Sequence, residues 1–161
     1  MDFLPGEYII KDGPLSFING AEATANDVTF ILSGTGAVLN IQSQSSLELK
    51  APSKGTRKGL AVMAVEDGSA PGNRKQEEKT SLIAEGGSLK VLGTIYLPNQ
   101  TLDIRGQNTS VGSIAPATSF IADTLHISGG AGARMNISVD HAAAGVPPIQ
   151  PRAEDGARLV E

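Results

Sequence analysis

The segment "GTIYLPNQTLDIRG" (residues 93–106) decides the fold of this chain. It holds two apolar-polar-apolar triplets, Ile95-Tyr96-Leu97 and Leu102-Asp103-Ile104, which are separated by Pro98-Asn99. Alternation with a period of two is typical of a β-strand, because successive side chains point to opposite faces. Pro and Asn favour a turn between the triplets. The segment therefore predicts two very short strands, each with one apolar and one polar face.

The same triplet recurs along most of the chain, separated by Gly-, Asn- and Pro-containing turns of low steric cost. Helix signatures are missing until the extreme C-terminus. The further triplets are Leu39-Asn40-Ile41, Leu47-Glu48-Leu49, Leu89-Lys90-Val91, Leu125-His126-Ile127 and Met135-Asn136-Ile137.

A longer repeat lies over the triplets. Apolar runs surround Phe30, Val62, Ile95 and Ile121, at intervals of 32, 33 and 26 residues. A period of this length indicates a solenoid, in which each coil buries its apolar face only by stacking on the next. We therefore predict an all-β fold, a single-stranded parallel β-helix of about four to five coils, with a right-handed coil preferred.

A β-sandwich is the alternative fold, because short alternating strands with frequent turns suit it as well. A sandwich needs hairpins, and no Asn-Gly or Asp-Gly turn joins two matched long strands. Asn19-Gly20 is followed by "AEATAND", a weak strand candidate. The missing hairpin chemistry favours the solenoid.

The predicted domain is a β-helix over residues 1–141, followed by an extended or disordered C-terminal tail, 142–161, which is available to cover one open end of the stack. The polar segment 66–80 is expected to be a loop leaving one corner of a coil. The first coil begins abruptly, so we expect the chain to be a piece of a longer protein. Ile95→Asp is expected to abolish folding. The residues expected to face inward are Phe30, Leu32, Ile41, Leu49, Val62, Val91, Ile95, Leu97, Ile104, Ile127 and Ile137.

Composition excludes several classes of function. The 161 residues carry a net charge of −4, no cysteine and two histidines. A disulfide framework and a thiolate metal site are therefore impossible. The short "KGTRK" at 54–58 is the main cluster of basic residues, too little for a nucleic-acid footprint. The longest apolar run, Leu60 to Val65, is far shorter than a membrane-spanning helix, and no signal peptide precedes it.

Four groups of residues are candidate chemical sites. Asp103 with Arg105, and Asp123 with His126, are candidate acid–base pairs for a bound sugar. Asp103 and His126 each occupy the middle of a triplet, so we interpret both as solvent-facing strand residues. Asp140-His141 is interpreted as a turn. The glycine-rich "GGAGAR" (129–134) is interpreted as a turn too, because a strand triplet follows it and not a helix. No catalytic, cofactor or metal site is predicted.

The order of several longer phrases resembles the C-terminal region of TadG-like putative pilus-assembly proteins of the bacterial tight-adherence (Flp pilus) system. The resemblance covers about Leu4 to Glu161. The phrases that carry it are "LPGEYIIKDGPLSF", "GAEATANDVTFILSGTGAVLNI", "SSLELKAP", "GLAVMAVEDGSAPG", "LGTIYLPNQTLDI", "SFIADTLHISGGAGARMNI" and "ARLVE".

This resemblance implies a non-enzymatic, extracytoplasmic module, periplasmic or at the cell surface, that acts as a rigid spacer or adhesion surface. The implied partners are pilus or cell-envelope proteins and surface polysaccharide. The family also implies membrane attachment, through an N-terminal segment that this sequence does not contain. Two alternatives stay open: a β-helix that binds or degrades polysaccharide, and a self-assembling scaffold of the bactofilin kind.

Overall fold

The computed structural model describes residues 1–65, 79–129 and 132–137, which form a parallel β-solenoid of about five coils. Every strand pairing is parallel, and each pairing joins one coil to the next. A β-sandwich is built from antiparallel neighbours, so the predicted parallel β-helix is confirmed and the sandwich is excluded.

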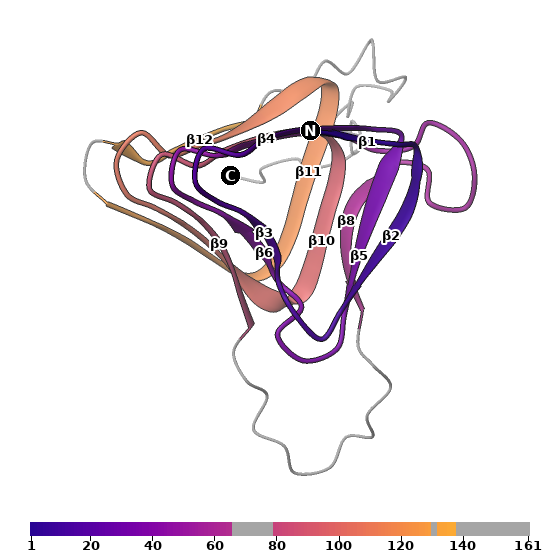
Figure 1. The fold of residues 1–161 in the computed structure, drawn as a ribbon, viewed down its shortest axis with the longest axis horizontal. Helices are drawn as coiled ribbons and strands as arrows, with labels where there is room; N and C mark the ends of the chain where they lie inside the picture. The colour runs from indigo at the N-terminus through magenta and orange to yellow at the C-terminus, as the bar shows by residue number, and fades with distance from the viewer. Residues whose placement is uncertain (66–78, 130–131, 138–161) are drawn as a thin grey trace, which may run out of the picture.

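Each coil has three sides, which Figure 1 shows as a triangular outline. The N-terminal parts of β10 (Ser88–Arg105) and β11 (Ser110–Ser128) belong to the first side, their middles to the second and their ends to the third. The first side also holds β1 (Asp2–Phe3), β4 (Glu22–Asn26), β7 (Ser46–Lys50) and β12 (Arg134–Asn136); the second holds β2 (Gly6–Lys11), β5 (Val28–Ser33) and β8 (Leu60–Val65); the third holds β3 (Leu15–Phe17), β6 (Leu39–Ile41) and β9 (Lys79–Ala84).

The two triplets of residues 93–106 lie on different sides of the same coil. Ile95-Tyr96-Leu97 belongs to the second side and Leu102-Asp103-Ile104 to the third. The sequence predicted two separate strands, and this was wrong. β10 continues through Pro98-Asn99 as it bends around the corner. Its pairing with β11 shifts register between Leu97 and Thr101, which marks the bend. Each triplet thus supplies one side of the triangle.

The longer repeat is a ladder along the second side. Phe30, Val62 and Ile95 are register partners on successive coils, as their spacing predicted. The next member is Phe120 and not Ile121, because Ile95 pairs with Phe120 while Tyr96 pairs with Ile121. The shift by one residue turns Ile121 outward.

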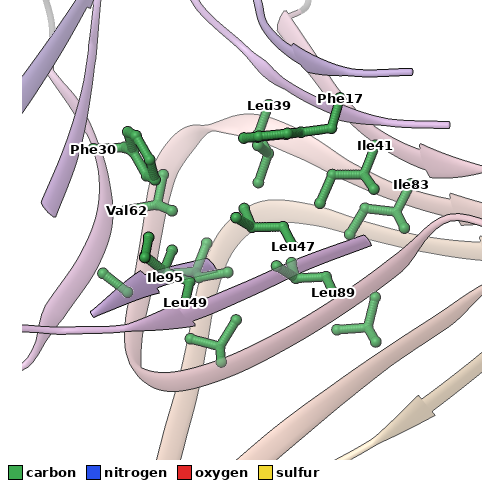
Figure 2. Packing of buried hydrophobic residues seen from close by; sticks show 14 of the residues in the cluster. Phe17, Phe30, Leu39, Ile41, Leu47, Leu49, Val62, Ile83, Leu89 and Ile95 are labelled. Atoms are coloured by element: carbon green, nitrogen blue, oxygen red, sulfur yellow. The ribbon is translucent and has the colours of Figure 1, made fainter. Parts of the chain in front are cut away.

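The core is one column of apolar side chains, to which all three sides contribute (Figure 2). Phe30, Leu49, Val62 and Ile104 are 0% exposed. At the N-terminal end of the column, Phe3 packs edge-to-face on Phe30 with ring centroids 5.1 Å apart. Burying each large side chain contributes about 1.5–3 kcal/mol, so the stacked column supplies the main stabilising free energy.

Two residues expected in the core are exposed. Ile127 is in register with Ile104, yet it is 46% exposed, and Ile137 is 44% exposed. On the third side, the described part of the chain places no strand beyond β11. An inward position is buried only when coils lie on both sides of it, so the pattern of the triplet alone overestimated the burial here.

The predicted loop 66–80 is wrong at its C-terminal end. Lys79 and Thr80 are the first residues of β9 and pair with Gln100 and Thr101. The remainder, 66–78, lies outside the described residues, as do positions 138–161, which hold the predicted tail and the end of the predicted domain. No helix in the described ranges is long and apolar enough to cross a membrane.

Candidate functional site

Asp103, Arg105 and His126 meet on the outer surface of the third side. Asp103 of β10 is the register partner of His126 of β11, so stacking brings the two side chains together. His126 Nδ1 lies 3.1 Å from Asp103 Oδ1, and Arg105 Nη1 lies 3.6 Å from Asp103 Oδ2. The Asp103 side chain is only 10% exposed, whereas that of His126 is 60% exposed.

This arrangement corrects two expectations. Asp103 points outward as the triplet predicted, but it is nearly buried, because the side chains of neighbouring coils cover it. His126 is exposed, as expected, but the candidate partner Asp123 of its own strand was the wrong one, because the ring contacts Asp103 of the preceding coil. Asp103 also contacts Arg105, the residue grouped with it as a candidate pair.

The geometry around Asp103 does not favour glycoside chemistry. Such chemistry uses two carboxyl groups that flank the bond to be cleaved, typically about 5–9.5 Å apart. Asp103 is nearly buried, and both of its oxygens already face a cationic or hydrogen-bonding neighbour. A hollow of about 290 Å³ lies nearby at the end of the third side, lined by Glu85 and Arg105 among others, but Asp103 and His126 are not among its lining residues. The cluster is best described as a tie between adjacent coils.

A larger hollow lies at the corner between the first and second sides. Its volume is about 500 Å³, and it is mostly apolar. One wall is the loop between β7 and β8, which contributes Ser53 and Lys58, and the floor includes Gly93, Thr94 and Ser119 of the next two coils. The sequence identified "KGTRK" only as a weak basic cluster. It gave no sign that Lys58 would stand at the edge of a depression.

The loop between β7 and β8 also reaches across the second side through Arg57. Its Nε lies 3.7 Å from Glu7 Oε1 on β2, and its Nη1 lies 3.0 Å from Met63 Sδ on β8. Since β5 is between β2 and β8, the guanidinium passes over β5. Ile31 of β5 points outward there, yet it is 6% exposed. Arg57 therefore shields one apolar residue of an outer face.

The outer surface of the first side is polar and carries both charges. Ser46, Ser88 and Ser110 are in register on successive coils, and Ser110 Oγ lies 3.1 Å from Ser88 Oγ. In the neighbouring row Glu48 faces Lys90. The surface is a ladder of small hydroxyls and exposed charges, which suits contacts with polar partners.

Residues 1–65, 79–129 and 132–137 contain no group of three His, Asp or Glu side chains close enough to hold a metal ion. Asp140-His141 lies outside these ranges. Of "GGAGAR", Gly130 and Ala131 are likewise outside, and the strand expected after it is present as β12. Comparison of the chain with protein-family models, with curated proteins and with solved structures finds no match in any of the three.

Proposed function

We propose that this chain is a non-enzymatic, extracytoplasmic module of a TadG-like pilus-assembly protein, acting as a rigid spacer or as an interaction surface for adhesion. The observation that carries the mechanical part is the continuous parallel pairing of successive coils. β5, for example, is paired along its whole length with β2 on one side and from Phe30 to Ser33 with β8 on the other. The resemblance of the sequence supports the link to pili.

The mechanism of such a module is mechanical and interfacial. Bending the stack requires breaking ladder hydrogen bonds on at least one side and opening a shared apolar core, so the stack is stiff. Its five coils span about 24 Å along the axis at about 4.8 Å per coil. The hydroxyl and charge rows of the first side then meet pilus proteins, envelope proteins or surface polysaccharide.

The test is genetic, in the bacterium that encodes the chain. Removing the codons for residues 1–141 is expected to reduce the number of surface pili and the attachment of cells to a solid substratum. Ile95→Asp should reproduce that loss, because it destroys the stack, whereas Asp103→Asn should leave attachment intact. Attachment unchanged by the deletion would contradict the proposal. Protease added to intact cells and to spheroplasts tests the location, since an extracytoplasmic module is cut without lysis.

Binding of acidic polysaccharide is the second candidate, and the corner hollow is the observation that favours it. Lys58 offers a cation, and Ser53, Thr94 and Ser119 offer hydroxyls around an apolar floor. Titration calorimetry with uronic-acid oligosaccharides tests it, with Lys58→Ala as the variant and Lys54→Ala as the matched control, since Lys54 is exposed in the same loop but does not line the hollow. Release of reducing ends that disappears with Asp103→Asn would establish degradation in place of binding.

A further inference from the structure

A row of apolar side chains runs along the outer surface of the second side, one from each coil. The register places Ile9, Ile31, Met63, Tyr96 and Ile121 side by side, because each is the partner of the next. Their neighbours Phe30, Val62 and Ile95 face the core, so alternation directs this row outward. The row is the apolar counterpart of the hydroxyl row on the first side.

The two ends of this row are open to solvent. Ile9 is 68% exposed and Ile121 46% exposed, while the middle is shielded where Arg57 crosses β5. Neighbouring coils bury the middle of this row, but the stack leaves the large apolar side chains at its two ends partly in solvent. A repeated series of them along one face is typical of an interaction surface.

We propose that the second side pairs with the second side of another copy of this chain. The occupant is indicated by the charges that flank the row. A two-fold axis parallel to the solenoid axis places the apolar row of one copy against the apolar row of the other. The strands that face each other across this contact are then antiparallel. Glu7, at the outward position before Ile9, then faces Lys11 of the other copy, at the outward position after Ile9. All three side chains are exposed, and the two charges are opposite. Glu7 also lies 3.7 Å from Arg57 Nε of its own chain, so in the dimer its carboxylate is shared between Arg57 and Lys11.

The other end of the row is complementary in the same way. In β11, Ser119 comes before Ile121 and Asp123 after it, so the two-fold places Asp123 of one copy opposite Ser119 of the other. Ser119 lines the corner hollow, and so does the cationic Lys58. Asp123 is exposed and thus approaches a hollow that presents a cation and a hydroxyl. In the middle of the row the strand residues Thr29 and Ser33 are uncharged, and the charge on this part of the face is that of Arg57, which crosses β5.

The area of the face gives the size class of the interface. Five coils at about 4.8 Å and strands of about 20 Å give roughly 500 Å² per copy. This lies at the low end of specific interfaces. The dimer is therefore concentration-dependent, and any partner with a flat apolar row competes for the same face.

Sedimentation velocity of the full chain over a range of concentrations tests the pairing. The native chain should show a monomer–dimer equilibrium. Ile121→Lys should shift it to monomer, whereas Lys90→Glu, on the first side, should not. Glu7→Lys and Lys11→Glu should each weaken dimerisation by roughly tenfold, because two attractive pairs become repulsive. Circular dichroism confirms that each variant is folded.

The decisive measurement mixes the two charge variants. Glu7→Lys carries two lysines at the contact and Lys11→Glu carries two glutamates, so an equimolar mixture should restore dimers as mixed pairs. Restoration requires position 7 of one copy to face position 11 of the other. A chain that stays monomeric at millimolar concentration, dimers unaffected by Ile121→Lys, or a mixture no stronger than its components would each overturn the proposal.

Discussion

Ser81 Oγ lies 2.8 Å from Gln100 Oε1 inside the solenoid, so a hydroxyl of β9 donates to an amide oxygen of β10. Both residues are buried, at 0% and 3% exposed. The contact is one link of a chain of hydrogen bonds: the Leu39 amide donates to Ser81 Oγ, and Gln100 Nε2 donates to the Ala37 carbonyl. Polar groups from three successive coils thus satisfy one another in the interior.

Gln100→Ala should lower the free energy of unfolding by about 1–3 kcal/mol, because it leaves the Ser81 hydroxyl and the Ala37 carbonyl without their buried partner. Urea denaturation followed by circular dichroism measures the loss. Gln107→Ala is the matched control, since Gln107 is exposed in the turn after β10. Equal losses in the two variants would show that the interior network contributes nothing.

Ile95→Ala should cost about 2–5 kcal/mol, because it removes a buried side chain from the ladder and leaves a cavity between Val62 and Phe120. Ile18→Ala removes the same atoms from a residue that is 49% exposed, so its cost should be well under half as large. Thermal and urea unfolding of the two variants provides the comparison. Equal losses of unfolding free energy in the two variants would show that the buried ladder is not the main source of stability.

The inward and outward positions were predictable from the sequence, since period two depends only on the geometry of one strand. The register between coils was less predictable from the sequence. Whether Phe120 or Ile121 follows Ile95 depends on the register shift at the corner between Val91 and Gly93, where β11 runs through three more residues than β10, and apolar spacing does not encode this. The contact of Asp103 with His126 depends on a second register shift, between Leu97 and Thr101. Arg57 reaches Glu7 and Met63 from an irregular loop, where no periodicity applies.

Gly93→Ala should destabilise the fold more than Gly36→Ala. Gly93 has a φ of +120° and sits where the chain passes the corner hollow, and a Cβ there would lie 2.5 Å from Ala51 Cβ. Gly36 has a φ of +71° with open space around it, so its substitution costs only the backbone strain, about 1–2 kcal/mol. Denaturation midpoints of both variants measure the difference. Similar midpoints would mean that the corner between β7 and β10 yields to accommodate a methyl group.

The contact between Asp103 and His126 should contribute only a small coupling energy. The His126 side chain is largely in solvent, so a double-mutant cycle with Asp103→Asn and His126→Ala should give about 0.2–1 kcal/mol. Unfolding free energies of the four proteins provide this value. A coupling of several kcal/mol would show a tightly constrained pair and revive the acid–base interpretation of this cluster.

Hydrogen exchange should alternate along β2. The amides of Gly6 and Asp12 donate to Asp27 and Ser33 on the next coil, so the even-numbered amides between them, Tyr8 and Ile10, face β5 as well. The odd-numbered amides, Glu7, Ile9 and Lys11, point away from β5, and within the described ranges β2 has no other neighbour. In β5, which lies between β2 and β8, both sets of amides should exchange slowly. Exchange resolved by residue in nuclear magnetic resonance distinguishes these patterns, and slow exchange of the Ile9 amide would mean that another strand covers the edge of β2 in solution.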